Sequence, residues 1–113
     1  MSYELPHHRL RVYHFAKRLA VVCQQLSKRV PRGYGHITDD LRRSSSAVAL
    51  LVGEGANIRP SKRKTQRYAE ALGECGETAV ALELLQDMGV LNASEALALC
   101  IDTHRMLQAL SKR

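Results

Sequence analysis

The sequence contains no tryptophan, one phenylalanine and four tyrosines in 113 residues. Proteins that bind single-stranded nucleic acid commonly stack the bases on aromatic side chains placed among cations, so this composition argues against base-specific recognition. The sequence also lacks a run of about 18 apolar residues, the length that a membrane helix requires. Its start has no basic segment followed by an apolar one, as a secretion signal has. We therefore expect a cytoplasmic protein without a membrane association.

Cysteine is also sparse. Cys23, Cys75 and Cys100 are odd in number, far apart and not arranged as Cys-x-x-Cys pairs. This spacing indicates neither a disulfide framework nor a zinc site. We expect three buried free thiols that pack as small apolar side chains.

Patterns that carry catalysis or bind cofactors are missing as well. Ser44, Ser45 and Ser46 lack the Gly-x-Ser-x-Gly turn of a serine hydrolase, and no glycine-rich phosphate loop follows a strand. Di-iron helix bundles carry a Glu-x-x-His motif on each of two helices, and no expected helix here contains one, although glutamates recur at helical spacing at positions 70, 74 and 77. We expect no enzyme activity, no metal and no cofactor.

The apolar residues recur at alternating spacings of three and four, which predicts amphipathic helices. The first stripe, for example, consists of Val12, Ala16, Leu19, Cys23, Leu26 and Val30. The last stripe contains either Cys100 or Ile101. Short connections between helices favour antiparallel neighbours. We therefore predict an all-α fold, a single antiparallel up-down-up-down four-helix bundle over residues 1–113, with helices at about 8–29, 38–56, 61–88 and 93–111.

Several residues indicate where these helices begin. Thr38 is a plausible N-cap for the second helix because the two aspartates that follow it suit the positive end of the helix dipole. Ser61 is the expected N-cap of the third helix. Residues 92–95 resemble a capping box for the fourth, with Asn92 as the cap and Glu95 three residues later. His7 and His8 fall in a segment that we expect to be frayed.

The second predicted helix contains a stretch, residues 44–53, without any charged side chain. A helix on the surface of a soluble protein normally has a polar face there. A chain of this length has no second layer to cover an apolar outer side, so we expect self-association through this helix. The expected interface residues are Ala47, Ala49, Leu50 and Gly53.

Charge is unevenly distributed along the chain. Residues 1–67 carry fourteen Lys and Arg against four Asp and Glu, whereas residues 68–113 carry three against seven. Lys62, Arg63 and Lys64 lie in the first turn of a predicted helix, where the dipole disfavours cations. Helix N-termini bind phosphate through free amide groups, so cations at this place suggest a surface for RNA or another polyanion. The alternative is a solvated charge cluster, paired with acidic residues of a neighbouring subunit. The candidate phosphate contacts, expected on one end or flank, are Arg42, Arg43, Arg59, Lys62, Arg63, Lys64 and Arg67.

The order and spacing of short motifs resemble those of a bacterial protein family encoded in intervening sequences of 23S rRNA genes, which is itself similar to the accessory proteins of diversity-generating retroelements. The motifs span nearly the whole chain: Leu10 with Val12-Tyr13, Val30-Pro31, Tyr34-Gly35, Leu41-Arg42-Arg43, Glu54-Gly55, Arg59, Ser61, Gly73 and Glu77.

This resemblance implies a four-helix bundle assembled as a ring of five with a basic surface for RNA and, in the retroelement branch, a reverse transcriptase as partner. Our leading hypothesis is a non-enzymatic, homo-oligomeric and pentameric adaptor that binds structured RNA through the seven cations. The alternative is a protein-interaction scaffold that binds no nucleic acid, for example an accessory subunit of a nucleic-acid-processing protein.

Overall fold

A computed structural model describes residues 3–112, and Met1, Ser2 and Arg113 of the expected domain lie outside the described residues. Within residues 3–112 the chain forms four α-helices and one short 3-10 helix, and no strand. In chain order the elements are η1 (Pro6–Arg9), α1 (Arg11–Ser27), α2 (Gly35–Ala56), α3 (Lys62–Asp87) and α4 (Ser94–Ser111). The expectation of an all-helical fold is confirmed.

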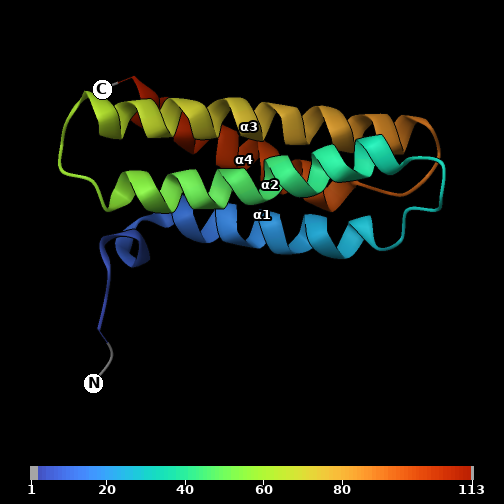
Figure 1. Ribbon diagram of the computed structural model, residues 1–113, viewed down its shortest axis with the longest axis horizontal. Helices are drawn as coiled ribbons and strands as arrows, with labels where there is room; N and C mark the ends of the chain where they lie inside the picture. The colour runs from blue at the N-terminus through green and yellow to red at the C-terminus, as the bar shows by residue number, and fades with distance from the viewer. Residues whose placement is uncertain (1–2, 113) are drawn as a thin grey trace.

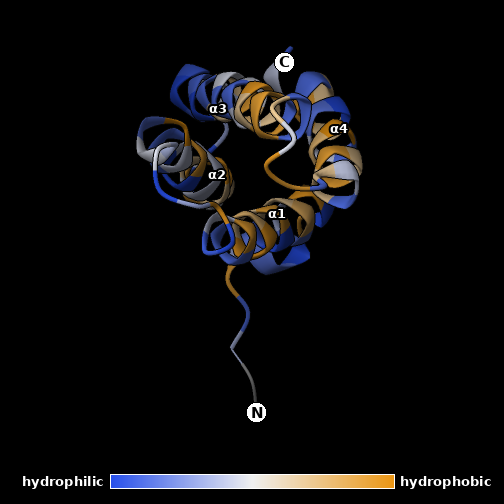
Figure 2. Ribbon diagram, turned by 90° about the vertical axis from the view of Figure 1, so that its right-hand side faces the viewer, coloured by the Kyte–Doolittle hydropathy of each residue, from blue (hydrophilic) through white to orange (hydrophobic). Residues whose placement is uncertain are grey.

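Each helix packs against two others. α1 and α3 both contact α2 and α4, so the four helices surround one core, with their apolar sides turned inward (Figure 2). The beginnings of α1 and α3 meet the ends of α2 and α4 at one end of the bundle (Figure 1). The longest dimension of the molecule is 43 Å, which matches the ~39 Å that the 26 residues of α3 span at 1.5 Å per residue.

The largest fully buried side chains of the core are leucines, and all four helices contribute to them. Leu19, Leu41, Leu82, Leu85 and Leu107 are fully buried. In the predicted stripe of the first helix, the members from Val12 to Cys23 are buried, whereas the last two, Leu26 and Val30, are only partly buried. The choice left open in the last helix falls on Cys100, which is 1% exposed, whereas Ile101 is 50% exposed. Burial of apolar area of this kind contributes roughly 25 cal/mol per Å² and is the main force that holds helices together.

The three cysteines are buried and free, as predicted. Cys75 of α3 and Cys100 of α4 lie side by side with their sulfur atoms 3.6 Å apart. Burial raises the pKa of the Cys23 thiol to about 12. Thiols in such surroundings remain protonated at neutral pH, so they pack as apolar groups and are poor nucleophiles.

A polar contact between α2 and α3 lies inside the core. The hydroxyl of Thr78 donates a hydrogen bond of 2.9 Å to that of Ser44, and both side chains are fully buried. Buried hydroxyls need partners because an unpaired one costs about 1–3 kcal/mol. Ser44 therefore has a structural role in the packing of α2 against α3.

Two of the predicted N-caps, Thr38 and Asn92, are wrong. α2 begins at Gly35, so Thr38 lies inside the helix, where its hydroxyl donates to the carbonyl of Tyr34 at 3.0 Å, and the aspartates at 39 and 40 lie beyond the first turn. At α4 the N-cap residue is Ala93, and no side chain caps the helix. Asn92 instead accepts a hydrogen bond from the amide of Ser94 at 3.0 Å. In both places short-range hydrogen bonds of a threonine or an asparagine replace the cap.

The predicted start and stop of the third helix are confirmed. The hydroxyl of Ser61 accepts a hydrogen bond from the amide of Lys64 at 3.2 Å. At the other end, Gly89 has a positive φ of 73°, and the amides of Gly89 and Val90 donate back to the carbonyls of Gln86 and Leu85. This paired arrangement is the Schellman motif, which favours glycine because of its left-handed backbone.

The segment around His7 and His8 is ordered, contrary to expectation. Both residues belong to η1, which packs against α1 and α2. The ring of His7 lies 4.6 Å from that of Tyr13, and its Nδ1 pairs with the side-chain amide of Asn57 at 2.9 Å. The side chain of His8 accepts a hydrogen bond from the amide of Leu5 at 2.9 Å. These contacts fasten the start of the chain to the end of the bundle that carries the first turn of α3.

Candidate anion-binding end of the bundle

The first turn of α3 carries the densest group of cations, and Ser61 fixes its geometry. Ser61 satisfies the amide of Lys64 and leaves the preceding amides of the turn to other acceptors, as is usual at a helix N-terminus. Lys62 and Arg63 occupy these preceding positions, and both side chains are exposed. Free amides and two cations therefore share one turn of the helix.

Three of the predicted phosphate contacts have no acidic partner. Within residues 3–112, the side chains of Arg59, Lys62 and Arg63 form neither an ion pair nor a hydrogen bond with a described residue. All three are exposed and lie within five residues of one another, on the α2–α3 connection and the start of α3. We name them the free cation cluster. Its charge is not neutralised within the described part of the subunit, so it attracts anions.

Lys64 has a different arrangement from its two neighbours. Its ammonium donates to the carbonyl of Ile58 at 3.1 Å and to that of Ala56 at 3.5 Å. It also lies 6.0 Å from the centre of the Tyr68 ring. The last carbonyls of a helix carry partial negative charge, so Lys64 stabilises the end of α2. We therefore assign it a structural role in addition to any contact with an anion.

Arg67 is paired within the subunit. Its Nε donates to a carboxylate oxygen of Glu54 on α2 at 3.0 Å, and its guanidinium also pairs with Glu70 one turn further along α3. These carboxylates raise the pKa of Arg67, with Glu54 as the larger influence. A guanidinium shared by two carboxylates is a weak phosphate ligand, so the structure separates Arg67 from the free cation cluster.

Arg43 and Arg42 are also engaged, and they lie far from the first turn of α3. Arg43 pairs with Glu77 and with Glu74, the latter at 3.2 Å, and the hydrogen bond that its guanidinium donates to Glu77 is the main reason why its pKa is raised. Arg42 donates to the hydroxyl of Ser27 at 3.0 Å and lies 3.6 Å from Asp39. Thirteen residues separate Arg43 from the end of α2, a distance of about 20 Å along the helix. The seven predicted contacts thus do not form one surface.

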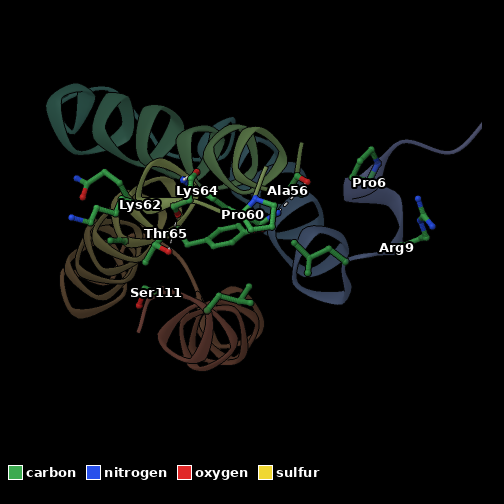
Figure 3. A pocket seen from close by; sticks show the side chains of 14 residues that line it. Pro6, Arg9, Ala56, Pro60, Lys62, Lys64, Thr65 and Ser111 are labelled. Carbon is green, nitrogen blue, oxygen red and sulfur yellow. Dashed lines mark hydrogen bonds between the residues drawn. The ribbon is translucent and has the colours of Figure 1, made fainter. Parts of the chain in front are cut away.

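A groove of about 910 Å³ opens beside the free cation cluster, and we name it the end groove (Figure 3). Residues from the start of the chain, the end of α2, the start of α3 and the end of α4 line it. In Figure 3, Lys62 and Arg9 stand on opposite sides of the groove, with Pro60 between them. Lys64 provides a third cation, and no Asp or Glu belongs to the lining. The apolar lining includes Leu10, Ala56, Pro60, Tyr68, Ala69 and Leu110.

The end groove was not predicted from the sequence. Neither Arg9 nor Leu110 was expected to have a role. The two residues come from opposite ends of the chain, and the topology brings them to the same end of the bundle. The predicted bundle already implies that these residues are neighbours, because alternating helix directions bring residues near positions 10, 56, 62 and 110 together. The presence of a groove between them depends on side-chain packing and was not predictable.

The predicted interface on α2 divides into two parts. Ala47 and Leu50 line a second groove, of about 630 Å³, between α2 and α3, and Leu50 is 73% exposed. Ala49 instead packs against the core. A side chain added at Gly53 would face Tyr13 of α1 at 3.8 Å. Only the first pair therefore lies on an open surface, which we name the α2/α3 groove.

Three glutamates form the polar side of the α2/α3 groove. Glu70, Glu74 and Glu77 line it together with Gly73, and they are the residues that pair with Arg43 and Arg67. Within residues 3–112 no group of three or more His, Cys, Asp or Glu side chains is placed to hold a metal ion. In the same part of the chain, no helix combines the length and the hydropathy needed to cross a membrane.

Comparison with known proteins gives one match. A family described as "23S rRNA-intervening sequence protein" matches residues 8–112, which includes all four α-helices. No curated protein and no solved structure matches the chain.

Proposed function

The chain belongs to the family of 23S rRNA-intervening sequence proteins, and we propose that it is a non-enzymatic, homo-oligomeric adaptor that binds structured RNA through one end of its helix bundle. The family description is consistent with an association with RNA. The contact surface that we propose is smaller than the one that the sequence suggested, because four of the seven cations have partners within the subunit.

The observation that carries this proposal is the free cation cluster. Within residues 3–112, Arg59, Lys62 and Arg63 have no partner around the N-terminus of α3, although the same part of the chain contains carboxylates that pair with Arg43 and Arg67. Cations in the first turn of a helix lie at the positive end of its dipole and destabilise the helix unless an anion is bound. A phosphate group satisfies the cations and the free amides together. Contacts of this kind bind the nucleic-acid backbone without reading its sequence.

Self-association is supported by the apolar surface of the α2/α3 groove. Leu50 is 73% exposed, and on α3 the side chains of Val80, Leu84 and Met88 are between 42% and 54% exposed. Burial of exposed apolar area favours association. Covering this surface by a second copy buries Leu50 and Ala47, as the charge-free stretch of α2 suggested.

The architecture and the assembly belong to the same proposal. An antiparallel up-down-up-down bundle is supported by the meeting of the starts of α1 and α3 with the ends of α2 and α4. From the family resemblance, we propose a ring of five copies and a kinship with the accessory proteins of diversity-generating retroelements. A cytoplasmic location and a nucleic-acid-processing protein as a further partner complete the proposal.

The experiment that tests it is a titration of the purified protein with a fluorescently labelled, structured RNA at two salt concentrations. Three phosphate contacts predict that log affinity falls with log salt at a slope of about −2 to −3. Absence of binding at low salt would contradict the RNA-binding part. The alternative function, a scaffold that binds only proteins, would then remain, supported by the apolar surface on α2 and α3.

A further inference from the structure

The end groove has a chemical character that an RNA backbone does not need. It is a single hollow of about 910 Å³, within the range of pockets that hold small molecules. Half of its lining residues are apolar or aromatic, and three are cations. Phosphate contacts with RNA require cations on an open surface, which the free cation cluster already provides. The apolar part of the end groove therefore needs another explanation.

Tyr68 provides an independent indication of a ligand. Its side chain lines the end groove, yet it is only 4% exposed. Within the described residues, its hydroxyl has no hydrogen-bond partner. No fully buried side-chain oxygen or nitrogen there lacks a partner, so the hydroxyl of Tyr68 is at least partly accessible. A tyrosine whose ring is buried and whose hydroxyl opens into a hollow presents a donor to whatever occupies that hollow.

The charges around the hollow select an anion. Lys62 and Arg9 stand at opposite sides of the groove with their charged ends turned outward (Figure 3), whereas Lys64 is held between the end of α2 and Tyr68 by its bonds to the carbonyls of Ala56 and Ile58. An ammonium has three donors, so Lys64 keeps one after these two bonds. Among residues 3–112, the lining includes no carboxylate that could neutralise these cations. A negatively charged group in the groove meets cations, a tyrosine hydroxyl and the N-terminus of α3.

We propose that the end groove binds a small amphipathic anion, a molecule with one carboxylate or phosphate group on an apolar body. The anionic group lies near Lys64 and the hydroxyl of Tyr68, on the side of the groove that Lys62 borders, and the apolar body lies against Leu10, Pro60 and Leu110. This inference goes beyond RNA association, because the ligand is a single small molecule in a hollow. Tyr68 is only 4% exposed, which leaves its ring too little free surface to stack a nucleotide base.

The test uses the full chain and isothermal titration calorimetry with two probes, decanoate and decyl phosphate, below their micelle concentrations. Decanol provides the control for the apolar body alone. We expect both anions to bind with a Kd below about 1 mM, and decanol to bind at least about tenfold more weakly, because it lacks the charge that the cations select. The anion with the lower Kd shows whether the groove prefers a carboxylate or a phosphate group. Equal binding of decanol and the anions would overturn the proposal.

Three substitutions locate the site without disturbing the core. Tyr68→Phe removes only the hydroxyl and should raise the Kd for decanoate about fivefold, which corresponds to the loss of one hydrogen bond. Lys62→Gln should raise the Kd for decanoate about threefold, as expected for the loss of an exposed charge. The matched control is Arg63→Gln, because Arg63 neighbours Lys62 in the same turn but does not line the groove. If Lys62→Gln and Arg63→Gln reduce the affinity for decanoate equally, decanoate binding depends only on overall charge, which would contradict the proposed site.

Ala69→Phe gives a further check. Ala69 is exposed and lines the groove, so a larger side chain fills the hollow while the helix remains intact. Decanoate binding should be lost, and the mass of the assembly in light scattering should remain unchanged. If neither anion binds the natural protein while Ala69→Phe changes the mass of the assembly, a second copy of the chain occupies the groove and the proposal is wrong. RNA titration of Ala69→Phe separates this inference from the proposed function, because RNA binding should be unaffected.

Discussion

Gly55 of α2 and Tyr68 of α3 approach each other so closely that a Cβ atom at position 55 would lie 2.8 Å from Cε1 of the tyrosine ring. Real Cβ atoms essentially never come so close to another heavy atom. The two helices can therefore pack in this way only because residue 55 has no side chain. This contact fixes Tyr68 at the end of the bundle, where it closes the core on one side and lines the end groove on the other.

We predict that Gly55→Ala destabilises the protein by about 1–3 kcal/mol, because the added methyl group overpacks the contact with Tyr68. The matched control is Gly76→Ala in α3, where an added Cβ meets nothing within 4 Å. That variant should gain roughly 0.5–1 kcal/mol, as alanine favours a helix more than glycine does. Urea unfolding followed by circular dichroism measures both. A stabilised Gly55→Ala variant would show that α2 and α3 are further apart.

The cations in the first turn of α3 should respond differently to reversal of charge. Replacing Lys62 and Arg63 with glutamate should raise stability by a few tenths of a kcal/mol each, because the helix dipole favours acidic residues there. Lys64→Glu should lower stability, because the bonds from Lys64 to Ala56 and Ile58 are lost and a carboxylate then faces those carbonyls. Thermal unfolding at low salt compares the variants. A loss of stability in the Lys62 and Arg63 variants would mean that these cations have structural partners.

Self-association should depend on Leu50. Leu50→Arg places a charge on the α2/α3 groove, and burying an unpaired charge in an interface is strongly unfavourable. We expect light scattering at micromolar concentration to show a smaller particle, with an unchanged helical signal. Ile101→Arg is the matched control, since Ile101 is an exposed apolar residue of α4. A natural protein that is already monomeric, or equal effects of both variants, would argue against an interface on α2 and α3.

The docking of η1 should weaken in acid. The pKa of His7 is lowered below its ordinary value of 6.5, first by partial desolvation and then by the neighbouring His8, His14 and Lys17. The unfolded segment therefore binds more protons than the docked one as the pH falls through the range below 6.5. Docking is strongest above this range and is lost as the pH falls through it. Amide hydrogen exchange of His8 and Leu10, whose amides donate to Leu5 and His7, should therefore accelerate between about pH 7.5 and pH 5.5 beyond the intrinsic change.

His7→Gln tests the origin of that pH dependence. Glutamine keeps a polar group near Asn57 but does not titrate, so the acceleration of exchange should decrease. If the variant keeps the full pH dependence, His7 is not the group responsible. If exchange in the natural protein does not change between the two pH values, the contacts of His7 with Tyr13 and Asn57 do not hold η1 in place.

The helices and much of the core were predictable from the sequence, because they depend on periodic burial. Residues such as Val12, Leu19 and Cys23 recur at helical spacing, and any bundle must bury them. The start of α2 was not predictable in this way. Thr38 has the right chemistry for a cap, but its hydroxyl bonds back to Tyr34, and the helix begins one turn earlier. Local propensity alone does not decide between these two uses of a threonine.

The candidate site was predicted in part. The cations around Ser61 are neighbours in the sequence, so their grouping required no tertiary information. The pairing of Arg43 with Glu74 and Glu77 joins residues more than 30 positions apart, and it depends on how α2 and α3 align. The same alignment brings Arg67 to Glu54. A count of charges cannot distinguish cations that are neutralised in this way from cations that are free to bind a ligand.

The central claim, that RNA contacts the free cation cluster and not the paired arginines, is tested most directly by the salt dependence of RNA affinity in two triple variants. Arg59→Gln with Lys62→Gln and Arg63→Gln removes the free cations, and Arg42→Gln with Arg43→Gln and Arg67→Gln removes the same charge from the paired ones. We predict that the first variant reduces the slope of log affinity against log salt by about 2, and that the second leaves the slope unchanged. Equal slopes in the two variants, or a loss confined to the second, would contradict the account.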